Sequence, residues 1–286
     1  MNRPSFSCGT WLCRALIAAI TCANGVGELA TAGVLDATPQ PLYTFLPDNS
    51  DGDTGLVLIA HGTASNPGVW ANQLKSFIDP QVSGWDVVAY DWSQHAGTTG
   101  IFPLDAEIAR TNAKNNVGPF VAQEIVSKGY TEIHFVGHSA GSWLIDSAAD
   151  LLDPNLVIHT TFLDAYTPTW AASGNLSLGD SADWSEHFVD TRPVPFTNSV
   201  LPQAYNIDVT LLDTPTVNPI DWHSWPHEWY RNTAADPNYL DAHGWGFQTS
   251  LELGTMPSHT HMRAGTARRC PRGHRSVPWR RHIWWL

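Results

Sequence analysis

Short apolar runs alternate with longer segments of helical periodicity through the central part of the chain. Four of these runs have the length and residue types of buried strands: 56–60, 86–90, 132–136 and 157–163. Strands that alternate with helices along a sequence are typical of a parallel sheet. The pattern therefore predicts an α/β fold with a mostly parallel central sheet covered by helices on both faces.

The helical segments are defined by their ends. The apolar pattern of residues 106–128 stops at Gly129, and Pro119 within it marks either a kink or the start of a new helix. Residues 140–152 carry apolar side chains along one face and are closed by Pro154. A further strand is expected over residues 205–212.

Charge divides the 286 residues into three parts. Residues 33–253 hold 26 Asp and Glu against six Lys and Arg, a net charge of −20, whereas residues 254–286 hold seven Arg and no acid, giving +7. The first 32 residues add +1, so the whole chain carries −12. Because nucleic-acid binding requires a positively charged surface, we expect no nucleic-acid function for the acidic body.

The first 32 residues have the order of a secretory signal peptide. Arg3 and Arg14 precede the apolar residues 15–20, and Ala30-Thr31-Ala32 has the small residues of a cleavage site, with cleavage after Ala23 as the alternative. The apolar run is far shorter than the roughly 20 residues that a membrane-spanning helix needs, so no stable membrane anchor is expected. These features predict a secreted or periplasmic protein.

Residues 254–286 form a basic tail rich in Arg, His, Trp and Pro, without periodicity. One interpretation is that the tail binds an anionic partner. The interpretation we favour is that this composition is foreign to the body, as if translated in a shifted reading frame. The catalytic domain is then 33–253. Three of the four cysteines lie in the predicted signal and Cys270 lies in the tail, so this domain has no disulfide.

The motif that carries chemistry is Gly137-His138-Ser139-Ala140-Gly141, which follows one predicted strand and opens the helix 140–152. At such a turn the two glycines relieve crowding around a strained serine whose Oγ projects above the sheet edge. The helix N-terminus favours negative charge that develops there. Ser139 is therefore the predicted nucleophile, and it requires a base that an acid orients.

The same edge of the sheet offers donors for an oxyanion. The strand 56–60 is followed by His61-Gly62-Thr63, where the Thr63 N–H would lie beside that of Ala140. His61 precedes the nucleophile, which is too early for the usual order of serine, acid and histidine. We expect His61 to be a structural residue.

From Leu56 to about Tyr230 the sequence resembles the pancreatic-lipase-type branch of the α/β-hydrolases. The resemblance rests on these motifs in order: His61-Gly62 with Trp70, Tyr90-Asp91-Trp92, Ala109-Arg110-Thr111-Asn112, Gly137 to Gly141, Leu163-Asp164-Ala165 and Phe188-Val189-Asp190. The resemblance implies that the catalytic acid follows the next strand after the one that leads into the Gly137 to Gly141 motif. In this sequence that acid is Asp164. The resemblance also implies a catalytic histidine followed six and seven positions later by two aromatics, which His223 with Trp229 and Tyr230 satisfies.

Alternatives remain for two members of this triad. Asp190 lies one strand later, where many α/β-hydrolases carry the acid, and Asp213 follows the expected strand 205–212. His227 is the other candidate base. A zinc site formed by His223 and His227 is disfavoured, because Pro226 separates them and no Glu follows the first histidine.

The resemblance implies a serine hydrolase acting on a small-molecule or lipid ester, with no cofactor and no metal. The animal enzymes' disulfide framework and colipase-binding domain are absent from the sequence, so ester hydrolysis is expected rather than digestion of emulsified fat. An amidase, a polyester depolymerase and a non-catalytic binding protein of the same fold are the alternatives.

Overall fold

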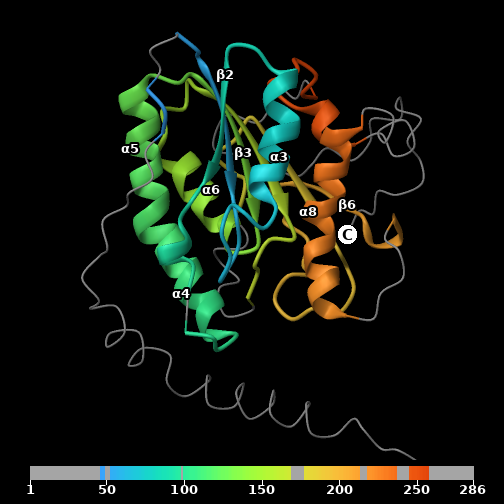
Figure 1. The fold of residues 1–286 in the computed structure, drawn as a ribbon. Helices are drawn as coiled ribbons and strands as arrows, with labels where there is room; N and C mark the ends of the chain where they lie inside the picture. Colours follow the sequence, from blue (N-terminus) through green and yellow to red (C-terminus); the bar gives the residue numbers. More distant parts are fainter. Residues whose placement is uncertain are drawn as a thin grey trace, which may run out of the picture. The chain divides into compact units, whose positions relative to one another are not determined.

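The computed structural model of the protein describes residues 46–48, 52–97, 99–168, 177–212, 218–236 and 245–257 (Figure 1). The predicted signal peptide, Asp213 and all but the first four residues of the basic tail lie outside this part of the chain. Within it, no helix combines the length and the apolar character that crossing a bilayer would require.

Six parallel strands form one sheet in the order β2-β1-β3-β4-β5-β6. The strands are β1 (Gly55–Ala60), β2 (Trp85–Tyr90), β3 (Glu132–His138), β4 (Val157–Leu163), β5 (Trp184–Val189) and β6 (Tyr205–Asp208). The four predicted strands and the predicted fold class are confirmed. Strand order reverses between β1 and β3, and in open α/β sheets ligands bind at the carboxyl ends of strands beside such a reversal.

Helices cover both faces of the sheet (Figure 1). Those on one face are α4 (Leu104–Asn112), α5 (Gly118–Lys128) and α6 (Gly141–Leu151), and those on the other are α3 (Ala71–Ile78) and α8 (Pro219–Ala235). The alternation of side chains along β1 serves both layers, because Leu56 and Leu58 belong to one core cluster while Val57 and Ile59 belong to the other.

The helical segment expected over 106–128 is interrupted. A π-helical turn (Ala113–Val117) separates α4 from α5, and Pro119 lies in the first turn of α5, where its missing N–H costs no helical hydrogen bond. Gly129 ends α5 with φ +80°. Pro119 therefore marks the start of a new helix.

The strand expected over 205–212 is shorter than predicted. β6 stops at Asp208, whose Oδ1 accepts a hydrogen bond from the Thr210 N–H at 2.9 Å, and a 3₁₀ turn (Thr210–Leu212) follows. A side chain that bonds the backbone two residues later competes with strand pairing.

Candidate active site

Ser139 occupies a tight turn between β3 and α6, with φ +55°. Few residues other than glycine adopt a positive φ, and such strain persists only where surrounding structure enforces it. The two glycines of the motif allow the turn, since a Cβ at Gly141 would lie 2.4 Å from the His61 carbonyl oxygen and one at Gly137 would lie 2.8 Å from the Gly141 carbonyl oxygen. The structure thus places Ser139 at the carboxyl edge of the sheet, beside the reversal in strand order.

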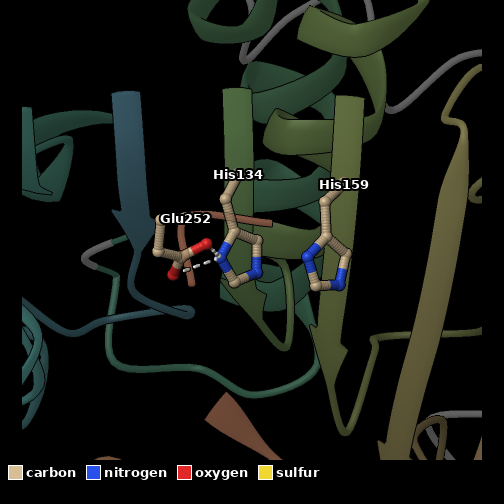
Figure 2. A group of neighbouring side chains, drawn as sticks. All are labelled: His134, His159 and Glu252. Atoms are coloured by element: carbon tan, nitrogen blue, oxygen red, sulfur yellow. Dashed lines mark hydrogen bonds and ion pairs between the residues drawn. The ribbon is translucent and has the colours of Figure 1, made fainter. Parts of the chain in front are cut away.

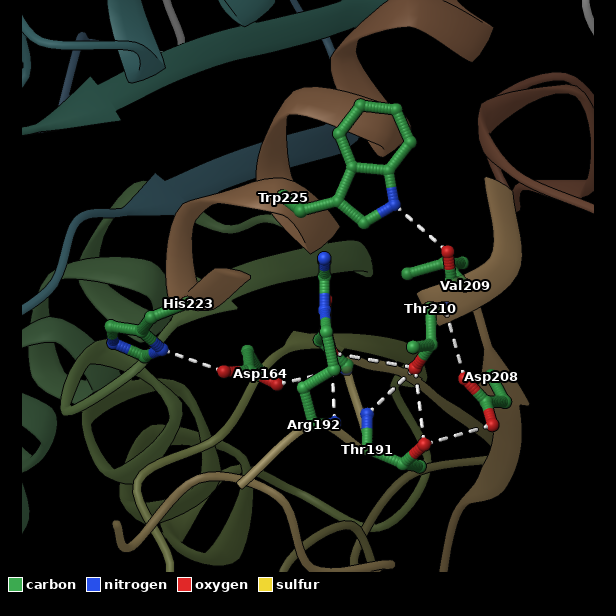
Figure 3. A network of polar contacts seen from close by, with 9 residues as sticks. Asp164, Thr191, Arg192, Asp208, Val209, Thr210, His223 and Trp225 are labelled. Carbon is green, nitrogen blue, oxygen red and sulfur yellow. Dashed lines mark hydrogen bonds and ion pairs between the residues drawn. The ribbon is translucent and has the colours of Figure 1, made fainter. Parts of the chain in front are cut away.

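Asp164 directly follows β4, and its carboxylate lies against His223. The Oδ2 of Asp164 is 2.6 Å from Nδ1 of His223, and its Oδ1 accepts the Asp190 N–H at 3.0 Å (Figure 3). Burial raises the pKa of Asp164, while the hydrogen bonds from His223 and from the Asp190 N–H act in the opposite direction. The structure therefore brings together the acid and the base that the resemblance implied.

His223 lies in the first turns of α8 and is partly exposed, with 24% of its side-chain surface accessible. Asn218 caps this helix, because its side chain accepts a hydrogen bond from the Ile220 N–H. The helix continues through Pro226, so His223 and His227 lie on the same helix. The separation of the two histidines by a proline was therefore wrong as an argument against one helix that carries both. The only hydrogen bond that Pro226 removes from the helix is the one that an N–H at this position would donate to the Trp222 carbonyl.

A contact that the sequence did not predict joins the Gly137 to Gly141 motif to α8. The Nε2 of His138, the residue before Ser139, lies 3.1 Å from the backbone oxygen of His223, and the two imidazole rings are 4.5 Å apart. His138 is buried, and this burial holds its pKa well below the usual value. No sequence signal marks this contact, because the second position of a G-x-S-x-G motif is unrestricted.

The rival candidates occupy other surroundings. The Asp190 carboxylate is bound by Arg192, and only the Asp190 backbone N–H reaches Asp164. His227 is buried and stacked on Trp70 at 4.8 Å, and burial lowers the pKa of His227 to about 3. Asp213 lies outside the described residues.

The loop of residues 61–64, which we call the oxyanion loop after its predicted role, lies against Ser139. A Cβ added to Gly62 would lie 2.9 Å from the Ser139 Cβ, so the backbone beside Thr63 closely approaches Ser139. Ala64 ends this loop with φ +48°. Within the described residues neither the Thr63 nor the Ala140 N–H donates a hydrogen bond, and both are therefore available to an oxyanion.

His61 has the surroundings of a structural residue. Its imidazole is buried, lies 5.3 Å from the stacked ring of Trp92 and hydrogen-bonds the Gly62 carbonyl through Nδ1 at 3.0 Å. The Trp92 indole N–H donates to the His61 backbone oxygen at 3.0 Å. These contacts fix the start of the oxyanion loop.

A second group of titratable side chains includes residues of β3 and β4 that precede the carboxyl ends of these strands (Figure 2). His134 of β3 and His159 of β4 are paired in register, and Glu252 approaches from the C-terminal segment. We call these three, together with Thr161 and Glu186, the buried polar cluster. His134 Nδ1 is 2.8 and 2.9 Å from the two Glu252 oxygens, and its Nε2 is 2.9 Å from Thr161 Oγ1.

His134, His159 and Glu252 of this cluster are the group among the described residues whose ligand atoms come close enough for a metal ion, all within 4.8 Å. The rings of His134 and His159 are parallel, with centroids 4.0 Å apart. A metal binds a histidine along its nitrogen lone pair, which lies in the ring plane, so two stacked rings do not point at one ion. As oriented, these side chains form a hydrogen-bonded network.

This network predicts a pH effect on stability. Burial raises the pKa of Glu186 to about 7 in the folded protein, above the value of about 4.5 expected for an unfolded chain. Below pH 4.5 Glu186 is protonated in both the folded and the unfolded state, and the full stability is retained. This stability is lost as the pH rises through about 7, because the unfolded chain ionises more readily than the folded protein. We expect Glu186→Gln to melt at a higher temperature than wild type at pH 8 but not at pH 4.5. An equal difference at both pH values would contradict this assignment.

Residues 56–283 match the α/β hydrolase family, a range that continues into the basic tail. No protein with a curated function matches the chain.

Among solved structures, the chain is similar to a lipase-esterase related protein from Clostridium acetobutylicum, with 14% identity, a TM-score of 0.28, and coverage of 45% of this chain and 49% of that one. It is also similar to an uncharacterized protein from Bacillus cereus, with 12% identity, a TM-score of 0.31, and coverage of 61% and 52%. The chain thus spans about half the length of each.

Proposed function

Because the chain belongs to the α/β-hydrolase family, we propose that it is a serine hydrolase that cleaves carboxylic esters through an acyl-enzyme. The observation that carries this proposal is the 2.6 Å hydrogen bond between Asp164 and His223, at the sheet edge where Ser139 is held in a strained turn. A buried carboxylate bound to a histidine Nδ1 leaves Nε2 as the atom that takes a proton from a serine.

The proposed reaction is a double displacement. Ser139 Oγ attacks the ester carbonyl as His223 Nε2 takes its proton, and the carbonyl oxygen becomes an oxyanion that accepts hydrogen bonds from the Thr63 and Ala140 amides. His223 then returns the proton to the departing alkoxide, which leaves an acyl group on Ser139. A water molecule, deprotonated by His223, releases the acid and regenerates the serine. Asp164 holds the imidazole in one tautomer and stabilises its charged form.

Exposed apolar side chains support a substrate with an apolar portion. Six of the eight large apolar side chains that are more than 40% exposed among the described residues occur in segments that follow the carboxyl ends of β1, β2 and β6 and at the start of α8: Val69, Ile101, Phe102, Leu104, Leu211 and Ile220. The other two, Val126 and Leu151, lie on α5 and α6. The segments of the first six lie at the edge of the sheet that carries Ser139. We propose that this apolar rim meets the acyl chain or an ester-rich surface.

Labelling by a fluorophosphonate probe tests the proposed chemistry. The probe reacts with serines that a neighbouring base activates, so we expect wild type to be labelled and Ser139→Ala to remain unlabelled at the same protein concentration. Ser142→Ala is the matched control, because Ser142 Oγ donates to the Gly137 carbonyl and takes no part in the proposed reaction. Absence of labelling in folded wild type would refute a serine hydrolase.

A chain-length series of p-nitrophenyl esters then tests the substrate class. If the apolar rim meets the acyl chain, kcat/KM should rise from acetyl to octanoyl esters, and Phe102→Ser should reduce the preference for the longer ester. An amide or polyester substrate remains the alternative within this chemistry, and the same variants can be assayed on both.

Export belongs to this proposal as well. The order of charged, apolar and small residues in 1–32 supports a secreted or periplasmic enzyme that loses this segment. Sequencing the N-terminus of the protein recovered from its source would locate the cleavage site.

A further inference from the structure

Arg192 is one of only six basic residues in the acidic body, and it lies three residues after β5. Its backbone N–H and its Nε each donate to Asp190 Oδ1 at 2.9 Å, and Nε also reaches Oδ2 at 3.0 Å. A further hydrogen bond joins its Nη2 to Asp190 Oδ2. The Asp190 side chain is fully buried and that of Arg192 is 18% exposed, so the pair is largely removed from solvent.

The Asp190 backbone connects this pair to the proposed triad. Its N–H donates to Asp164 Oδ1 at 3.0 Å, while the other oxygen of Asp164 is bound to His223 (Figure 3). A carboxylate held at both oxygens cannot rotate about its Cβ–Cγ bond without breaking one of them. The position of the Asp190 peptide therefore determines the direction in which Asp164 faces the imidazole.

The other side of Arg192 contacts the segment that carries the base. Its guanidinium carbon lies 5.0 Å from the ring centre of Trp222, the residue immediately before His223. A guanidinium over an indole face is attracted to the electron-rich face of the ring. A second contact holds the first part of α8 in place, because the Trp225 indole N–H donates to the Val209 carbonyl at 2.9 Å (Figure 3).

We propose that Arg192 is a positioning residue that fixes the geometry of the Asp164–His223 pair. The edge of its guanidinium group binds the carboxylate of Asp190, the residue whose backbone N–H orients the acid, and the face of the group lies on the tryptophan that precedes the base. Arg192 thus couples the loop after β5 to the start of α8, two segments 30 residues apart in the sequence. This inference rests on the proposed function of the pair, although the geometric coupling can be measured without turnover.

Arginine is required for this role because of its shape. A planar fork can bind both oxygens of a carboxylate and stack on an aromatic ring at the same time, whereas the ammonium of lysine is a point charge without a face. We therefore expect Arg192→Lys to retain most of the stability conferred by the charge pair and to lose the positioning.

The test separates positioning from folding. Arg192→Gln alone leaves a buried carboxylate without its partner and is expected to be unstable. The double variant Asp190→Asn with Arg192→Gln removes both charges and keeps the Asp190 position's backbone N–H. We expect the double variant to melt near the wild-type temperature while kcat for a soluble ester falls about tenfold or more, since a displacement of about 1 Å can cost about 100-fold. KM is expected to change by less than about twofold.

A spectroscopic readout accompanies the kinetics. A histidine Nδ1–H bonded to a carboxylate gives a strongly downfield proton resonance, which His223→Gln would identify by its loss. We expect this resonance in wild type and in the control Arg231→Gln, which alters a basic residue of α8 that hydrogen-bonds Gln73. In the double variant and in Arg192→Lys it should broaden or move upfield.

Two results would overturn the inference. A double variant with wild-type stability, kcat and Nδ1–H resonance would show that Arg192 only neutralises a buried charge, and Arg192→Lys with wild-type kcat would exclude a need for the fork. If wild type hydrolyses no ester but its His223 Nδ1–H resonance still depends on Arg192, the proposed function is wrong. The inference that Arg192 positions the Asp164–His223 pair is then still supported.

Discussion

Replacing Asp164 by asparagine is expected to lower kcat for a soluble ester by about 10⁴-fold. The Asp164 carboxylate accepts the Nδ1 proton of His223 at 2.6 Å, which leaves Nε2 unprotonated and able to accept the serine proton in the proposed reaction. An asparagine amide can instead donate to Nδ1, and the histidine proton then resides on Nε2, where it blocks acceptance of the serine proton. Steady-state kinetics on a p-nitrophenyl ester measures the effect.

Asp213→Asn serves as the comparison, because Asp213 is another sequence candidate for the acid. We expect it to retain turnover within about twofold of wild type. Wild-type turnover by Asp164→Asn together with a large loss in Asp213→Asn would transfer the role of the acid to Asp213. Circular dichroism of each variant establishes that the loss does not come from unfolding.

The second large effect concerns stability. Glu252→Ala is expected to lower the free energy of unfolding by about 3–5 kcal/mol, because it leaves His134 buried without its partner. Both side chains are fully buried, and the carboxylate bonds Nδ1 of His134 at 2.8 and 2.9 Å. Burial alone would raise the pKa of Glu252, but the neighbouring His134 lowers it, and the net shift is downward. Urea unfolding at pH 7 measures the difference.

The sign of that shift sets the pH range of the effect. A carboxyl whose pKa is lowered by folding adds stability above its unfolded pKa of about 4.3, and this stability is lost as the pH falls through the folded value. The difference between wild type and Glu252→Ala should therefore shrink in acid. A difference that grows in acid would contradict the assignment of an ionised Glu252.

Truncation gives an independent measure of the same contact. A chain that ends at Gly254 keeps Glu252 and is expected to retain the stability and activity of the full protein, whereas one that ends at Gln248 loses this contact and should be destabilised. Equal destabilisation by both truncations would mean that the basic tail contributes to the fold.

Local features of the sequence predict those parts of the structure that depend on near neighbours. The strand 56–60 is a continuous apolar run, and Gly129 and Pro119 mark helix ends through their own backbone chemistry. The end of β6 was missed because the Asp208 side chain competes with the sheet ladder, a contact that hydrophobic pattern does not report. The π-helical turn before α5 has no comparable signal.

Longer-range contacts depend on information that periodicity does not contain. Asp164 and His223 are 59 residues apart, and they were paired only through the resemblance to a known family. Glu252 and His134 are 118 residues apart, and both types of side chain are usually exposed, so nothing in the sequence predicts that they meet in the core. Arg192 likewise has no motif of its own.

Positive φ angles at Ala64, Ser139 and Asp164 have a consequence for the evolution of this protein. Each strained position costs of order 1–3 kcal/mol that glycine would largely recover. For Ser139 and Asp164 that substitution would also delete the reacting group or its acid. Selection for thermal stability alone would therefore favour glycine at these positions and loss of the proposed triad. Persistence of the triad among related sequences would indicate selection for turnover.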